Sequence, residues 1–199
     1  MQPMEPLTGQ RIEELLTAVG ELLRAEGHRC SIVVVGGASL NLLGLLERTT
    51  KDVDVVARAE EKGGRKIFVQ PDPLPEPLET AIATVARDFG LPADWINTRV
   101  STQWPKDLPK FLFEEIEWRQ FGSLETGIVS RRTLIALKLH AAVDRDADSV
   151  HYQDLIELAP TDTELEEARI IVVTQDAGIG FPQLLDELIS KLKLDVGRN

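Results

Sequence analysis

The stretch that decides the fold spans residues 33–58 and reads VVVGGASLNLLGLLERTTKDVDVVAR. It begins with a short, continuously apolar run, which is typical of a buried strand. A glycine pair, Gly36 and Gly37, follows directly. The leucine-rich segment after it predicts a short and mostly buried helix over residues 38–47. A second β-branched run then closes the stretch, and acidic residues interrupt it.

Two carboxylates in that second run need an explanation, because a half-buried strand disfavours aspartate. In a strand, Asp52, Asp54 and Val56 lie on one face. The residues predicted on the opposite face are Val53, Val55 and Ala57. The two aspartate Cα atoms are then about 6.6–6.8 Å apart. Unpaired carboxylates repel each other, and a divalent cation removes that cost. Mg²⁺ prefers oxygen ligands and keeps positions open for water and phosphate, so the pair predicts metal-assisted phosphoryl transfer. A solvated strand end with incidental acids is the alternative.

The neighbouring residues favour the metal interpretation. Glycine lets the backbone approach a ligand, and a helix start presents unpaired N–H groups to anions. Arg48 can neutralise phosphate, and Thr50 can offer a hydroxyl group. The stretch matches neither G-x-x-x-x-G-K-[ST] nor G-x-G-x-x-G. A phosphate cradle and a carboxylate pair are therefore predicted on adjacent elements.

The rest of the chain alternates strands and helices up to about residue 130. Helical spacing predicts a first helix between Thr8, a candidate N-cap, and Gly27, a candidate stop. Residues 91–110 are expected to be irregular. Further elements are expected in this order: a turn and strand at 60–70, a loop at 71–77, a helix at 78–89, strands at 111–121 and 124–130, and helices at 130–145, 149–160, 161–176 and 181–192. The apolar run at 170–173 could also form a strand, and the acidic residues before it favour a helix. We expect an α/β core over residues 1–130, with a helical region, 131–199, packed on it.

Composition restricts the class of protein. Lys and Arg total 22 against 33 Asp and Glu, a net charge of −11. This opposes an extended nucleic-acid-binding surface, although a local basic groove stays open. The single cysteine, Cys30, forms no intramolecular disulfide and is typical of a small core residue in a reducing compartment. No apolar run reaches 18 residues, and the start MQPMEPLTGQ lacks signal-peptide features. We expect a soluble, cytoplasmic protein without a membrane partner.

Three segments resemble a known family. GGAS followed by RTTKDVDVV resembles the signature of the nucleotidyltransferase-fold, or polymerase-β-like, superfamily, and is most similar to its AbiEii-type toxins. The later segment LIALKLHAAVDRDADSVHYQDLIEL also resembles this group. In the group, a helix carries a Lys, and a segment of the form K-D-x-x-D-L follows it. Lys138 matches that Lys and Asp154 the final Asp, whereas His151 replaces the first Asp. LPADWIN is also similar to this group.

The resemblance implies a mixed sheet with flanking helices and roles for particular residues. It implies that Asp52 and Asp54 hold Mg²⁺, that Lys138 contacts phosphate and that Asp154 orients Lys138 or a substrate group. The residues implied in nucleoside triphosphate binding are Gly36, Gly37, Ala38, Ser39, Arg48 and Thr50. A third carboxylate from a neighbouring strand is common in the superfamily. Glu115 and Glu117 are the candidates here, and the sequence does not choose between them.

We therefore expect a Mg²⁺-dependent nucleotidyltransferase that moves a nucleoside monophosphate from an NTP to an acceptor. The acceptor is an RNA end such as tRNA, a protein hydroxyl or a small molecule, and the resemblance implies a toxin paired with an antitoxin protein. The alternative is a catalytically silent member that binds a nucleotide or a partner protein, because His151 replaces an acid of the motif.

Overall fold

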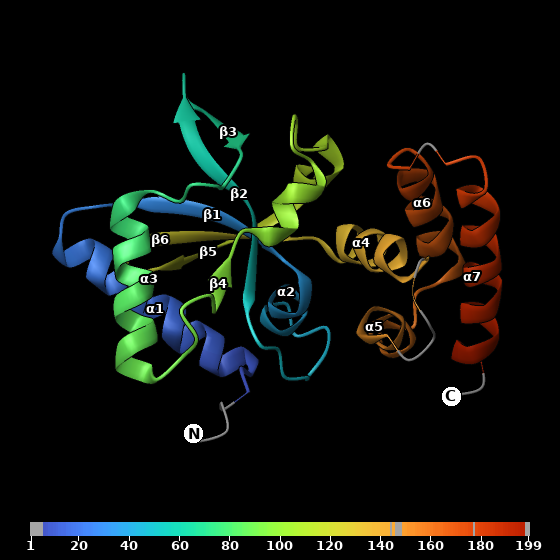
Figure 1. Ribbon diagram of the computed structural model, residues 1–199, viewed down its shortest axis with the longest axis horizontal. Helices are drawn as coiled ribbons and strands as arrows, with labels where there is room; N and C mark the ends of the chain where they lie inside the picture. Colours follow the sequence, from blue (N-terminus) through green and yellow to red (C-terminus); the bar gives the residue numbers. More distant parts are fainter. Residues whose placement is uncertain (1–5, 144, 146–148, 177, 198–199) are drawn as a thin grey trace. The chain divides into compact units, whose positions relative to one another are not determined.

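A computed structural model describes residues 6–143, 145, 149–176 and 178–197. The chain divides into two compact units, Met1–Val129 and Ser130–Asn199, here called the sheet unit and the helical unit. The sheet unit contains a mixed sheet with helices, and the helical unit contains α-helices (Figure 1). The α/β class with a helical C-terminal part is therefore confirmed.

The described part of the sheet unit forms a six-stranded sheet in the order β3-β2-β1-β6-β5, with β4 pairing to β2. The strands are β1 (Cys30–Val35), β2 (Val53–Lys62), β3 (Arg65–Val69), β4 (Ile96–Asn97), β5 (Ile116–Phe121) and β6 (Leu124–Val129). β1 runs parallel to β6, and β2 parallel to β4, whereas the other pairs are antiparallel. β2 and β3 are joined by Gly63 and Gly64, both with positive φ, as a two-residue hairpin turn requires.

Helices cover one face of this sheet. α1 (Gly9–Ala25) and α3 (Glu76–Phe89) pack side by side on it (Figure 1). The predicted N-cap is confirmed, since Thr8 accepts a hydrogen bond from the backbone N–H of Arg11. Residues of the sheet that join this core include Ile32, Val34, Val53, Val55 and Ile128. Each such fully buried aliphatic side chain contributes roughly 1.5–3 kcal/mol. The alternate residues of the same strands, Asp54 among them, point to the opposite face.

The expected face of Ala57 was wrong because β2 contains a bulge. Val34 pairs with Val55, but Val33 pairs with Ala57, so Val56 is an extra residue. Beyond it the alternation reverses, and Ala57 lies on the face of Asp54 rather than on that of Val55.

Three other predicted boundaries need correction. The helix predicted at 38–47 is α2 (Gly36–Leu42), which is shorter because Gly44 takes a positive φ of 65°. The segment 91–110, expected to be irregular, contains β4 and the 3₁₀ helix η1 (Arg99–Gln103). The strand predicted from residue 111 begins at Ile116, because a second 3₁₀ turn, η2 (Lys110–Phe113), precedes it.

β4 is anchored by the tryptophan before it. Trp95 is 1% exposed, and its indole N–H donates to the carbonyl of Ile82 in α3. Its own carbonyl accepts from the N–H of Val53 at 2.7 Å. The core therefore fixes the position of this two-residue strand.

The helical unit contains α4 (Arg131–Val143), α5 (Val150–Leu158), α6 (Asp162–Val173) and α7 (Phe181–Val196). α4 packs against α5, α6 and α7. The run at 170–173 belongs to α6, as predicted, and Thr161 with Glu164 forms a capping box at its start. Arg131 donates hydrogen bonds to Glu164 and so lowers the pKa of that carboxyl to about 2. Among the residues that the structure describes, no helix is both long and apolar enough to cross a membrane.

Candidate functional site

Asp54 lies against the glycine pair. It sits opposite Val35 in the β1–β2 ladder, and Gly36 follows Val35 directly. A Cβ atom on Gly36 would come within 2.7 Å of Asp54 Oδ2, closer than van der Waals contact allows. Gly36 also has a φ of 76°, which disfavours any side chain. The chain therefore needs glycine here to make room for its own carboxylate.

The second glycine makes room for the loop before the aspartates. A Cβ on Gly37 would lie 2.8 Å from Arg48 Nη2 and 2.9 Å from Thr50 Oγ1. Thr50 Oγ1 donates to the backbone carbonyl of Asp52 at 3.3 Å. The glycine bend, this loop and the two aspartates are thus contiguous, as the sequence predicted.

Asp52 has two side-chain donors that sequence analysis missed. Its Oδ2 accepts from Asn97 Nδ2 at 3.2 Å and from Arg99 Nη2 at 3.1 Å. Asn97 belongs to β4, where it pairs with Asp54 in parallel register and so shares its face of the sheet. The backbone N–H of Arg99 donates to Asn97 Oδ1, which fixes the orientation of the amide. The only sequence signal was a polar Asn at the end of WIN, two residues before an Arg.

We call the following set the aspartate cluster: Gly36, Gly37, Arg48, Thr50, Asp52, Asp54, Asn97 and Arg99. Its outermost member is Arg99, with 64% of the side chain exposed. Arg99 Nη1 also contacts Asp94 Oδ2 at 2.7 Å. Hydrogen bonding to Asp94 and the nearby charge of Asp52 raise the pKa of Arg99, and the hydrogen bond from Arg99 lowers the pKa of Asp94. The cluster is therefore held by a permanent cation at its edge.

The helical unit contains the other predicted pair. Lys138 Nζ in α4 lies 2.7 Å from Asp154 Oδ2 in α5, and the side chains are only 7% and 2% exposed. His151 precedes Asp154 by three residues in α5, which places both on neighbouring turns of the helix. The predicted proximity of Lys138 and Asp154 is therefore observed, and a contact of Lys138 with phosphate stays a prediction.

Comparison with known families decides the affiliation. The profile of the family "Nucleotidyltransferase of unknown function (DUF6036)" matches residues 10–171. The chain belongs to this family. The match includes both the aspartate cluster and the Lys138–Asp154 pair. No curated protein and no solved structure matches the chain significantly.

The two candidates for the third carboxylate of a nucleotidyltransferase differ in position, and Glu117 lies on the face of the sheet opposite Asp54. Glu117 pairs with Ile128, a core residue, and therefore points to the face opposite Asp54. It contacts Arg119 instead, and Glu115 is exposed. Within the described ranges, no group of three or more His, Cys, Asp or Glu side chains could hold a metal. In β4, the strand that pairs with β2, the residue opposite Asp54 is Asn97.

The donor set of the aspartate cluster nevertheless fits magnesium. Mg²⁺ is usually held by one or two carboxylates together with water and substrate phosphates, rather than by a complete protein cage. Asp52 and Asp54 are both half-buried; Asp52 directly precedes β2, and Asp54 is its second residue. They supply two carboxylates and leave the remaining positions to a substrate.

Two other residues predicted in nucleotide binding are buried. Ala38 packs in the core between the sheet and α1, and Ser39 is fully buried in α2. A contribution of either residue to nucleotide binding would therefore come from the backbone.

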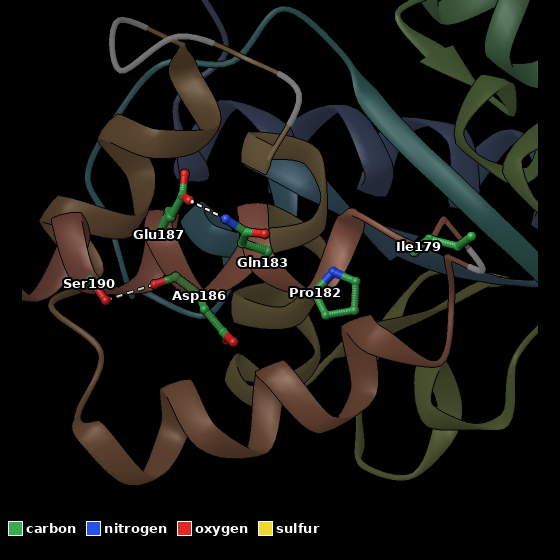
Figure 2. Close-up of a pocket in the computed structure, with 6 residues that line it drawn as sticks. All are labelled: Ile179, Pro182, Gln183, Asp186, Glu187 and Ser190. Atoms are coloured by element: carbon green, nitrogen blue, oxygen red, sulfur yellow. Dashed lines mark hydrogen bonds between the residues drawn. The ribbon is translucent and has the colours of Figure 1, made fainter.

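The helical unit also has a surface hollow on α7 (Figure 2). It is lined by Ile179, Pro182, Gln183, Asp186, Glu187 and Ser190. Its polar side chains bond to one another or along the helix, and Asp186 pairs with Arg169 of α6. None of the site residues that the sequence predicted lines this hollow.

Proposed function

We propose that the chain is a Mg²⁺-dependent nucleotidyltransferase, which moves a nucleoside monophosphate from an NTP to an acceptor. The observation that carries this proposal is the contact of the Asp54 carboxylate with the diglycine bend, in one cluster with Asp52. Membership of a nucleotidyltransferase family supports it independently.

Asp52 and Asp54 would hold the metal, which supplies charge neutralisation at the transferring phosphate when bound. Arg48 brings a guanidinium and Thr50 a hydroxyl to the surface of the glycine bend, where a triphosphate would find complementary groups. The family resemblance implies that Lys138 contacts a phosphate and that Asp154 orients Lys138 or a substrate group. Their 2.7 Å ion pair is consistent with that orienting role.

The reaction then needs no covalent enzyme intermediate. The acceptor hydroxyl oxygen forms a bond to the α-phosphorus as the bond to the bridging oxygen of the β-phosphate breaks. Pyrophosphate leaves, and a carboxylate of the aspartate pair takes the hydroxyl proton. The chain contributes mainly positioning and electrostatic complementarity.

The acceptor is a protein hydroxyl or a small molecule rather than a large RNA, because the net charge of −11 opposes a long polyanion. The resemblance to AbiEii-type proteins adds the proposal that the chain is a cytoplasmic toxin with an antitoxin partner. Growth arrest on expression, relieved by Asp54→Asn, is the expected result in cells.

Label transfer tests the enzymatic proposal. The protein is incubated with each NTP labelled at the α-phosphate, Mg²⁺ and candidate acceptors, beside Asp52→Asn and Asp54→Asn. Both variants should lose transfer, whereas Glu61→Gln should retain it, because Glu61 is an exposed acid at the far end of the same strand. Transfer that survives loss of both aspartates would refute the proposal.

A catalytically silent nucleotide-binding protein is the second candidate. It is favoured by His151, which replaces an acid of the family motif, and by the missing third carboxylate in the described ranges. Nucleotide binding without label transfer to any acceptor, unchanged by removal of Mg²⁺, would select this alternative.

A further inference from the structure

Arg99 places a positive charge on Asp52, one of the two carboxylates proposed to hold the metal. Asp52 Oδ2 accepts one hydrogen bond from Asn97 and one from Arg99, and a carboxylate oxygen has two lone pairs. A cation that binds Asp52 must therefore displace the Arg99 guanidinium or share the carboxylate with its positive charge. The charged donor is the one that competes electrostatically with a second cation.

The geometry lets the Arg99 side chain leave while its backbone stays in place. The backbone N–H is held by Asn97 Oδ1 at 3.1 Å, at the start of η1. The guanidinium is 64% exposed and bridges Asp52 and Asp94 through different nitrogens. Neither ion pair is buried, so separating the guanidinium from Asp52 costs little.

We propose that Arg99 couples metal binding to nucleotide binding, an inference that rests on the function proposed above. In the free protein its guanidinium neutralises Asp52 and opposes the divalent cation. A bound polyphosphate offers the guanidinium a new anionic partner and removes that opposition. The site consequently loads metal and nucleotide together, because each favours the state that the other needs.

Manganese binding tests this coupling. Mn²⁺ affinity is measured by electron paramagnetic resonance in 0.15 M salt, with and without a non-hydrolysable NTP, after correction for the metal–nucleotide complex. Without nucleotide, Arg99→Gln should bind Mn²⁺ about two- to fivefold more tightly than the wild type, as expected for loss of one exposed ion-pair competitor. The nucleotide should then tighten Mn²⁺ binding less in the variant than in the wild type.

Arg87→Gln is the matched control, since it removes the same charge from an exposed pair in α3. It should leave Mn²⁺ affinity unchanged, because distant surface charges are screened at this salt concentration. Equal Mn²⁺ affinities for Arg99→Gln and the wild type would overturn the coupling. Asp54→Asn separates the two proposals. If Asp54→Asn leaves Mn²⁺ binding intact, the proposed metal site is wrong. If Asp54→Asn weakens Mn²⁺ binding but Arg99→Gln does not change it, the metal site stands and the coupling fails.

Discussion

The aspartate cluster and the Lys138–Asp154 pair use charge in opposite ways. Asp52 is 28% exposed, and its partners are a neutral amide and a guanidinium that is 64% exposed. Lys138 and Asp154 are almost completely buried and lie 2.7 Å apart. Partners of the first kind can be exchanged for a ligand at small cost, whereas a buried pair cannot be separated cheaply. Exposure thus distinguishes charged residues whose partners a ligand can replace from those that hold the fold.

The largest effect is expected in the buried pair. Asp154→Ala leaves the Lys138 ammonium buried without its counter-ion and should lower the free energy of unfolding by about 3–5 kcal/mol. Urea denaturation measures the loss. The double variant Lys138→Met with Asp154→Leu should recover most of it, since two apolar side chains leave no buried charge. If Asp154→Ala is as stable as the wild type, the buried pair does not hold the fold.

Gly36→Ala should have the next largest effect. The left-handed backbone costs an alanine about 1–2 kcal/mol, and the added methyl group collides with Asp54 Oδ2. We expect a lower melting temperature together with weaker Mn²⁺ binding, because the carboxylate must move. Gly44→Ala is the matched control, since Gly44 has a φ of 65° with no atom near its Cβ position. It should lose stability but keep Mn²⁺ affinity.

Asn97→Ala should disturb the cluster more mildly. It removes one hydrogen bond to Asp52 and should weaken Mn²⁺ binding by up to about tenfold, the equivalent of one hydrogen bond. Asn97→Asp should instead tighten Mn²⁺ binding, because it adds a carboxylate beside Asp54. Weaker binding by the Asp variant would show that position 97 does not face the metal.

The smallest effect concerns the partly exposed Arg131–Glu164 pair, which sharpens the contrast with the buried pair. The folded-state pKa of Glu164 is about 2, below its ordinary value of 4.5. Its stabilisation is therefore complete above pH 4.5 and is lost as the pH falls towards 2. Glu164→Gln should cost about 1 kcal/mol at pH 7 and much less near pH 2, where the folded-state carboxyl is already partly protonated, as measured by denaturation at each pH. A cost at pH 2 as large as that at pH 7 would exclude the ionic cause.

Local patterns explain which parts of the fold were predictable. The apolar run of β1, the glycine pair and the aspartates of β2 each carry a signal within a few residues. β4 was missed because two residues show no periodicity, and Asn97 was missed with it. The bulge at Val56 and the early end of α2 depend on pairing and packing between distant segments. The contact of Lys138 with Asp154 was anticipated from family resemblance, since helical spacing does not relate two different helices.

The seating of Trp95 gives the protein its own optical probe. Its indole ring is enclosed in the core, whereas Trp104 and Trp118 are only partly covered. Movement of β4 away from β2 would expose that ring and shift its emission to longer wavelengths. Unlabelled protein can therefore report, in a fluorimeter, when the strand that carries Asn97 changes position as ligands bind.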